Sequence, residues 1–136
     1  MALVLDTSFL VALNSKADIN HAKAQSLKQR LKNREFGQIF ISDYIFDEFA
    51  TFLMAKSFPP AIIREIGDSL LAEESIGLLK ISPEVFLKSW ELFKKMKSIS
   101  FTDCTTLVLS NETGIKNIAS FDADFDRFPS VKRITD

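Results

Sequence analysis

Asp6 is the first residue of this chain whose position indicates chemistry. It follows the apolar run 2–5 and precedes two hydroxyl residues, Thr7 and Ser8. A short aliphatic run of this kind is typical of a buried parallel strand, and open α/β sheets bind ligands at the carboxyl ends of such strands. A carboxylate at that point suits a metal ion or a site that handles phosphate groups. The alternative is that Asp6 caps a following helix, because Asp is a preferred N-cap residue.

Three further acids occupy comparable positions. Asp103 stands at the start of a predicted helix, and Asp122 comes just after a predicted strand. Glu48 lies on the otherwise apolar face of another predicted helix, beside Ile45 and Phe49. Each acid also has a purely structural interpretation: a first-turn acid, a turn-forming acid and a helix-edge acid respectively.

Together the acids favour a shared site over separate structural roles. The carboxyl ends of parallel strands gather at one edge of a sheet, so residues far apart in sequence can meet there. Carboxylates packed closely repel one another unless a cation or a proton intervenes. Hard oxygen ligands suit Mg²⁺ or Mn²⁺, and such ions support attack of water on a phosphodiester. We therefore expect a divalent-metal site that hydrolyses phosphodiester bonds.

Alternating strands and helices must bring these acids together. We expect strands at 2–5, 38–41, 76–81, 116–120 and 131–135. We expect helices at 8–14, 21–33, 43–56, 60–72, 83–97 and 103–111, with Thr102 capping the last and Gly114 closing it. In the second helix, the predicted apolar stripe is Ile19, Ala22, Ala24, Leu27 and Leu31. The alternation predicts a three-layer α/β/α fold around a mostly parallel sheet of four or five strands.

Size and composition narrow the class of protein. A chain of 136 residues predicts a single domain covering 1–136. The net charge of −1 gives no general attraction to nucleic acid, so any site for a polyanion must be local. The single cysteine, Cys104, excludes an internal disulfide and indicates a reducing, cytoplasmic location. No apolar run reaches the length of about 20 residues that a membrane span needs.

Three other features have to be interpreted as structural or functional. The basic stretches 28–34 and 94–97 are interpreted as solvated helix faces. The apolar stretch 46–60 fits the core, or alternatively a groove for a partner helix. The sole histidine, His21, is interpreted as a surface or capping residue rather than a general base.

The chain resembles the PIN-domain ribonucleases, and most of all the VapC-type toxins of toxin–antitoxin systems. The resemblance covers nearly the whole chain and rests on four segments, which are Val4-Leu5-Asp6-Thr7-Ser8, Asp47-Glu48, Thr102-Asp103 and Ser120-Phe121-Asp122-Ala123-Asp124-Phe125. It implies that the acids of the family's metal site are Asp6, Glu48, Asp103 and Asp122.

The resemblance also suggests roles for neighbouring residues. Ser8 looks like the hydroxyl that orients Asp6, and Ser120 stands where threonine is usual but retains the hydroxyl. Asp124 and Asp126 compete with Asp122 for the position nearest the metal, so the choice among them stays open. Asp47 competes with Glu48 but points about 100° away around the helix.

The implied activity is a Mg²⁺- or Mn²⁺-dependent endoribonuclease that leaves a 5′-phosphate and a 3′-hydroxyl. The resemblance further implies an RNA substrate, a cognate antitoxin protein and a homodimer. A catalytically inactive PIN-like module that binds RNA or protein is the alternative. A phosphate-accepting receiver domain fits less well, because it needs a second acid beside Asp6, where Thr7 and Ser8 stand.

Overall fold

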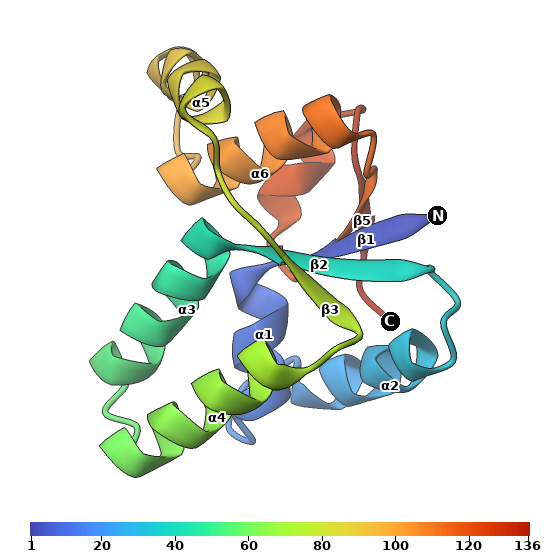
Figure 1. Ribbon diagram of the computed structural model, residues 1–136, viewed down its shortest axis with the longest axis vertical. Helices are drawn as coiled ribbons and strands as arrows, with labels where there is room; N and C mark the ends of the chain where they lie inside the picture. The colour runs from blue at the N-terminus through green and yellow to red at the C-terminus, as the bar shows by residue number, and fades with distance from the viewer.

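A five-stranded parallel sheet forms the centre of the protein (Figure 1). The computed structural model describes residues 1–136. The strands are β1 (Ala2–Leu5), β2 (Gln38–Ser42), β3 (Ile76–Leu79), β4 (Asn117–Ala119) and β5 (Lys132–Ile134). Their order across the sheet is β3-β2-β1-β4-β5. Every pairing is parallel, as the alternation of strands and helices in the sequence predicts.

Helices cover both faces of this sheet. They are α1 (Thr7–Asn14), α2 (His21–Lys32), α3 (Asp43–Ala55), α4 (Pro60–Ala72), α5 (Pro83–Lys95) and α6 (Phe101–Thr113), with the short 3₁₀ helix η1 (Ala123–Arg127) before β5. In Figure 1, α5 and α6 lie above the sheet and α1 to α4 lie below it. The three-layer α/β/α architecture is therefore confirmed.

The position of β1 explains where its following residue emerges. Leu3, Val4 and Leu5 are all buried, and β1 pairs with β2 on one side and β4 on the other. The chain leaves β1 toward β2 and returns later to β4, so the strand order changes direction beside β1. Open parallel sheets bind ligands at this kind of switch point, outside the carboxyl ends of the strands. Asp6 is the first residue beyond that end.

Serine caps define the start of three helices. Ser42, Ser82 and Ser100 each accept a hydrogen bond from the backbone N–H three residues ahead, at the starts of α3, α5 and α6. The prediction that Thr102 caps the last helix was wrong. Ser100 has an extended backbone and reaches the Asp103 amide at 3.0 Å, so α6 begins at Phe101 and includes Thr102. Gly114 closes α6 in the left-handed conformation, as predicted.

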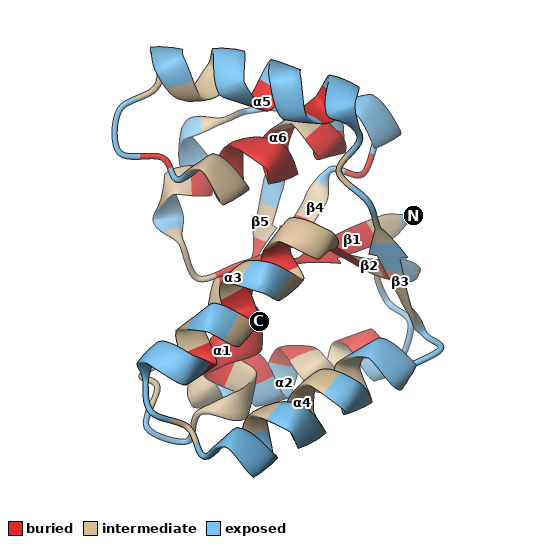
Figure 2. Cartoon of the chain, turned by 60° about the vertical axis from the view of Figure 1, so that its left-hand side comes forward, coloured by how far each residue is buried: buried red, intermediate tan, exposed pale blue.

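The larger core cluster lies between the sheet and the helices below it, and a smaller one lies on the other side of the sheet, where α6 is also largely buried (Figure 2). Phe9 and Phe49 are among its largest fully buried side chains. The predicted stripe of α2 is correct for Ala24, Leu27 and Leu31 but wrong for Ile19 and Ala22, which are exposed. Ile19 precedes the helix, in the loop after α1, so it does not continue the apolar face.

Some element ends differ from the prediction. The third strand stops at Leu79 rather than Ile81, because the Ile81 amide donates its hydrogen bond to Asp43 Oδ1. Helix α5 ends at Lys95 rather than 97. None of the helices combines the length and the hydropathy needed to span a lipid bilayer.

Candidate functional site

A cavity of about 460 Å³ lies at the carboxyl edge of the sheet. The four acids that the resemblance assigns to the metal site all line it, namely Asp6, Glu48, Asp103 and Asp122. They come from separate parts of the fold: the end of β1, helix α3, the first turn of α6 and the segment after β4. The topology thus brings four distant carboxylates to one hollow, as the strand-end argument predicts.

Asp6 occupies the N-cap position of α1, but its side chain makes no capping hydrogen bond. Its Oδ2 atom instead accepts hydrogen bonds from Ser8 Oγ at 2.8 Å and from Ser120 Oγ at 2.7 Å. Its Oδ1 atom is buried and has no hydrogen-bond partner in the protein. The capping interpretation of Asp6 was therefore wrong. A buried carboxylate oxygen without a partner is costly and indicates a ligand.

The two serine hydroxyls form an ordered network around Asp6. Ser8 Oγ accepts from the Phe121 amide at 2.9 Å, and Ser120 Oγ accepts from the Asp122 amide at 3.0 Å. Each hydroxyl has one proton, and both protons point to Asp6 Oδ2. Oδ2 is thereby held as an acceptor of two hydrogen bonds, which leaves Oδ1 as the oxygen that can meet a ligand. The hydrogen bond that the sequence predicts between Ser8 and Asp6 is present, and Ser120 adds a second one.

Asp103 is buried at the start of α6, and its pKa is strongly raised. Loss of water raises its pKa, the charges of Asp6, Asp122 and Glu48 raise it further, and the result is about 8. Burial likewise raises the pKa of Asp6, against the lowering effect of its bonds to Ser120 and Ser8. The negative charges of these acids therefore act on one another across the cavity.

Glu48, rather than Asp47, faces the cavity. Glu48 is half-buried and lines it, whereas Asp47 is exposed, as their separation around the helix predicts. The acids after β4 are also separated. Asp122 lines the cavity and caps η1 by accepting from the Asp124 amide at 2.9 Å. Asp124 does not line the cavity.

Asp126 forms an ion pair with Arg133 and does not line the cavity. Both of its oxygens accept from the Arg133 guanidinium, at 3.0 and 2.7 Å, and this ion pair lowers its pKa. A carboxylate held by both oxygens in this way is not available to bind a metal ion in the cavity. Among the three acids of this segment, the structure favours Asp122 as the candidate ligand.

The donor chemistry of the cavity fits a hard divalent cation. Carboxylates dominate its polar lining, no Lys, Arg or His contributes to it, and Asp6 Oδ1 has no partner. The side chains do not form a closed cage, because no three His, Cys, Asp or Glu groups stand close enough together to hold one ion. Binding therefore requires carboxylates to turn toward a common point.

Sequence reasoning missed several residues of the cavity. Asp18, Asn20, Thr7 and Ser100 also line it. Asp18 Oδ1 accepts from the Asn20 amide at 2.8 Å and so shapes the loop between α1 and α2. The cluster of Ser, Asp and Asn at 15–20 indicated a loop, but no local pattern showed that residues of this loop line the cavity.

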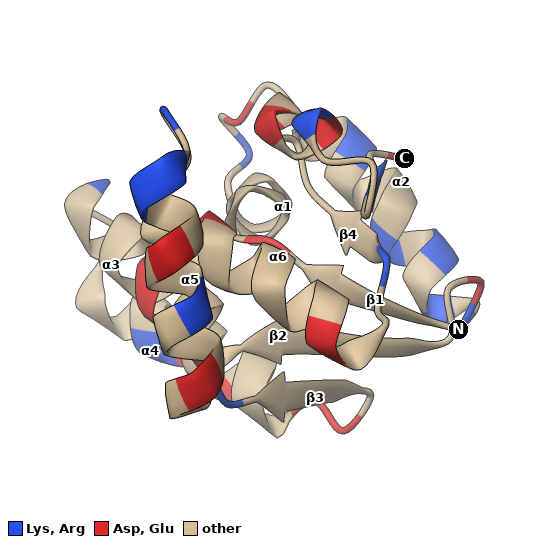
Figure 3. Ribbon diagram, turned by 90° about the horizontal axis from the view of Figure 1, so that it is seen from above, with Lys and Arg blue, Asp and Glu red and all other residues tan.

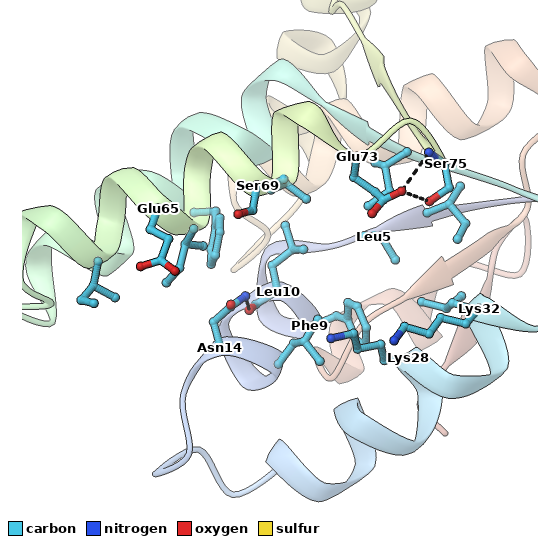
Figure 4. A pocket seen from close by; sticks show the side chains of 18 residues that line it. Leu5, Phe9, Leu10, Asn14, Lys28, Lys32, Glu65, Ser69, Glu73 and Ser75 are labelled. Atoms are coloured by element: carbon cyan, nitrogen blue, oxygen red, sulfur yellow. Dashed lines mark hydrogen bonds between the residues drawn. The ribbon is translucent and has the colours of Figure 1, made fainter.

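A second, larger cavity of about 520 Å³ has a different character (Figure 4). It lies between α4 on one side and α1 and α2 on the other, and 11 of its 18 lining residues are hydrophobic. Lys28 and Lys32 stand on the α2 side, opposite Glu65 and Glu73 on the α4 side. None of the four candidate metal ligands reaches it, so its size does not make it a catalytic site.

Comparison with known proteins identifies the family. The family model for the PIN domain matches residues 3–131. The chain belongs to the PIN domain family. A VapC ribonuclease of Archaeoglobus fulgidus is 26% identical to this PIN-domain chain, over 98% of the chain and 84% of that protein.

Solved structures agree with this fold. VapC20 of Mycobacterium tuberculosis, a sarcin-ricin loop cleaving toxin, superposes with a TM-score of 0.80 at 21% identity over 93% of this chain and 95% of that one. VapBC2 of Rickettsia felis, bound to a DNA fragment from its promoter, gives 0.72 at 17% identity over 98% of each chain. The predicted likeness to VapC-type toxins is confirmed.

Proposed function

We propose that this PIN-domain protein is a divalent-metal-dependent endoribonuclease, the toxin of a toxin–antitoxin pair that acts in the cytoplasm. The observation that carries the proposal is Asp6 Oδ1, buried without a partner in a cavity that three other acids line. The similarity to a VapC ribonuclease supports RNA as the substrate. The alternative, an inactive binding module, gives no reason for grouping uncompensated acids at the switch point of the sheet.

Each residue of the cavity has a separate role in this proposal. Asp6, Asp103 and Asp122 would hold Mg²⁺ or Mn²⁺, and Glu48 would complete the site or orient the attacking water. A bound divalent ion activates water and stabilises negative charge on the attacked phosphate. Ser8 and Ser120 fix the Asp6 carboxylate through Oδ2 and leave Oδ1 for binding. Asp103 must give up the proton that its raised pKa retains near neutral pH.

A cleavage assay with matched variants tests the proposal. Single-stranded RNA is incubated with Mn²⁺ or Mg²⁺ and with each variant, and the products are separated by size. Asp6→Asn, Asp103→Asn and Glu48→Gln should lose cleavage, because each removes a carboxylate of the cavity. Asp47→Asn is the control, since this neighbour of Glu48 is exposed and lies outside the cavity. Metal-dependent cleavage retained by both Asp6→Asn and Asp103→Asn would overturn the assignment.

The proposed protein partner is an antitoxin, with a homodimer as the assembly of the toxin itself. Similar folds occur in the VapBC2 structure and in a toxin–antitoxin complex of Klebsiella pneumoniae, the latter with a TM-score of 0.66. The 520 Å³ apolar cavity fits an amphipathic helix, because α4 has no fully buried residue and exposes apolar side chains beside it. Ile66→Asp should abolish co-purification with the antitoxin, and sedimentation gives the mass of the assembly.

A further inference from the structure

The cavity presents an electrostatic difficulty for an RNA substrate. Its charged lining residues are all acids, and no cationic side chain lines it. RNA carries a negative charge at every phosphate, and proteins gain most of their nucleic-acid affinity by contacting those phosphates with Lys and Arg. A metal ion in the cavity would neutralise charge only at the cleaved bond. The phosphates on either side need cations outside the cavity.

Such cations occur on two segments that each also supply a cavity residue. Lys95 ends α5 and Lys97 follows in the turn to Ser100, which lines the cavity. Arg127 ends η1, the helix that Asp122 caps. The two segments meet directly, because Arg127 Nη1 donates a hydrogen bond to the Lys97 carbonyl oxygen at 3.1 Å.

The turn that carries Lys97 has a defined conformation. Ser98 adopts a left-handed backbone with a φ of 62°, and the Ile99 side chain beside it is buried. The turn is thus held by the buried side chain of Ile99 and by the hydrogen bond from Arg127. Ordering a side chain on a fixed turn costs less entropy than ordering a free loop around a ligand. Lys97 is therefore presented from a defined turn, three residues before Ser100, which lines the cavity.

These cations are also available for an anion. Lys94 binds Glu91 at 2.9 Å, and Lys88 binds Glu84 and Glu112. Lys95 and Lys97 have no carboxylate within 4.0 Å, and Arg127 only reaches Asp124 at that limit. In Figure 3 the basic end of α5 is separated from the basic residues of α2 across the molecule. The solvated-face interpretation holds for Lys94 but leaves the neighbouring cations unexplained.

We propose that Lys95, Lys97 and Arg127 form a cationic rim that binds the RNA backbone phosphates flanking the cleaved bond. This inference rests on the proposed ribonuclease function and adds to it the residues that hold the substrate strand. The rim binds and orients the strand but takes no part in the chemical step. Its loss should weaken RNA binding and raise KM, while kcat at saturating RNA stays nearly unchanged.

The test measures the salt dependence of RNA binding. The double variant Lys95→Gln with Lys97→Gln is compared with Lys116→Gln with Lys132→Gln, two exposed lysines at the opposite, amino edge of the sheet. Binding of a fluorescent single-stranded oligoribonucleotide is measured in an Asp103→Asn background, so that cleavage does not interfere. We expect the rim variant to bind about tenfold more weakly at low salt, and the slope of log K against log salt to fall by about 1.4. The control variant should keep both values.

The possible outcomes distinguish a failure of the rim proposal from a failure of the ribonuclease proposal. If the rim variant keeps the wild-type affinity, salt slope and KM while the wild-type protein cleaves RNA, the rim is wrong and the enzyme proposal stands. If the wild-type protein neither binds nor cleaves RNA, both proposals fail. A rim variant that changes only its sedimentation mass would show that these cations serve a protein contact and would also overturn the rim.

Discussion

Ser120 Oγ donates a 2.7 Å hydrogen bond to Asp6 Oδ2 and so joins the ends of β4 and β1. Both residues are buried and lie 114 positions apart in sequence. The same hydroxyl accepts from the Asp122 amide, so Ser120 positions two acids of the cavity at once. The geometry of the site therefore depends on a residue that carries no charge.

Ser120→Ala should reduce both stability and activity. The change leaves the Asp122 amide without its acceptor and removes one of the two donors to Asp6. Loss of a hydrogen bond to a charged group costs about 1.5–3 kcal/mol, and urea denaturation measures this as a fall in the free energy of unfolding. Ser120→Thr is the control, because it retains the hydroxyl. Equal RNA cleavage by the Ala and Thr variants would contradict the positioning role.

Asp122→Asn should reduce cleavage strongly, and Asp126→Asn should leave it nearly unchanged. Asparagine still caps η1, so Asp122→Asn should keep the fold while removing a carboxylate from the cavity. Asp126→Asn only weakens an ion pair with Arg133 at the surface, which is worth about 0–1 kcal/mol. We expect at least a 100-fold loss of cleavage in the first variant and less than a threefold change in the second. The reverse order would make Asp126 the ligand.

The sequence predicted the elements and the candidate acids because their signals are local. The aliphatic run before Asp6 indicates the central strand, and the serines before α3 and α5 indicate where these two helices start. Glu48 was distinguished from Asp47 by helix periodicity alone, and the structure places only Glu48 at the cavity. Parallel α/β topology then predicts that acids at strand ends meet.

The rest of the site depends on contacts that no local pattern encodes. The structure favours Asp122 over Asp126 because Arg133, which lies on another element, holds Asp126. Asp18 lines the cavity because the tertiary fold brings the loop after α1 to it. The contact between Arg127 and the Lys97 carbonyl likewise joins segments whose sequences show only separate charges.

Asp103 should make the metal-free protein less stable as the pH rises. Its pKa is about 8 in the folded protein, against an ordinary value of 3.8, so between these values the folded state binds more protons than the unfolded state. The free energy of unfolding therefore falls as the pH increases from about 4 to about 8. Asp6, whose pKa is also raised, acts in the same direction.

Asp103→Asn tests this dependence. The variant should be more stable than the wild-type protein at pH 8 in EDTA, on the order of 1–3 kcal/mol, and the difference should shrink toward pH 5. Urea denaturation at a series of pH values measures both trends. A wild-type stability that rises with pH over this window, or a variant that follows the wild-type curve, would show that Asp103 is not a repelled, buried carboxyl.

Mn²⁺ should stabilise the protein more at pH 8 than at pH 6, which is opposite to the effect of rising pH on the metal-free protein. A divalent ion binds the ionised carboxylates and so competes with the proton on Asp103, which makes its apparent affinity higher at pH 8 than at pH 6. At 100 times its Kd, an ion that binds only the folded state adds about 2.7 kcal/mol to the free energy of unfolding.

We therefore expect Mn²⁺ to raise the Tm, with a larger increase at pH 8, in the wild-type protein and in Asp126→Asn. Asp6→Asn and Asp103→Asn should lose the increase, because each removes a charge that the ion needs. A rise in Tm that persists in both variants would place the ion outside this cavity, whatever the effect of these substitutions on RNA cleavage.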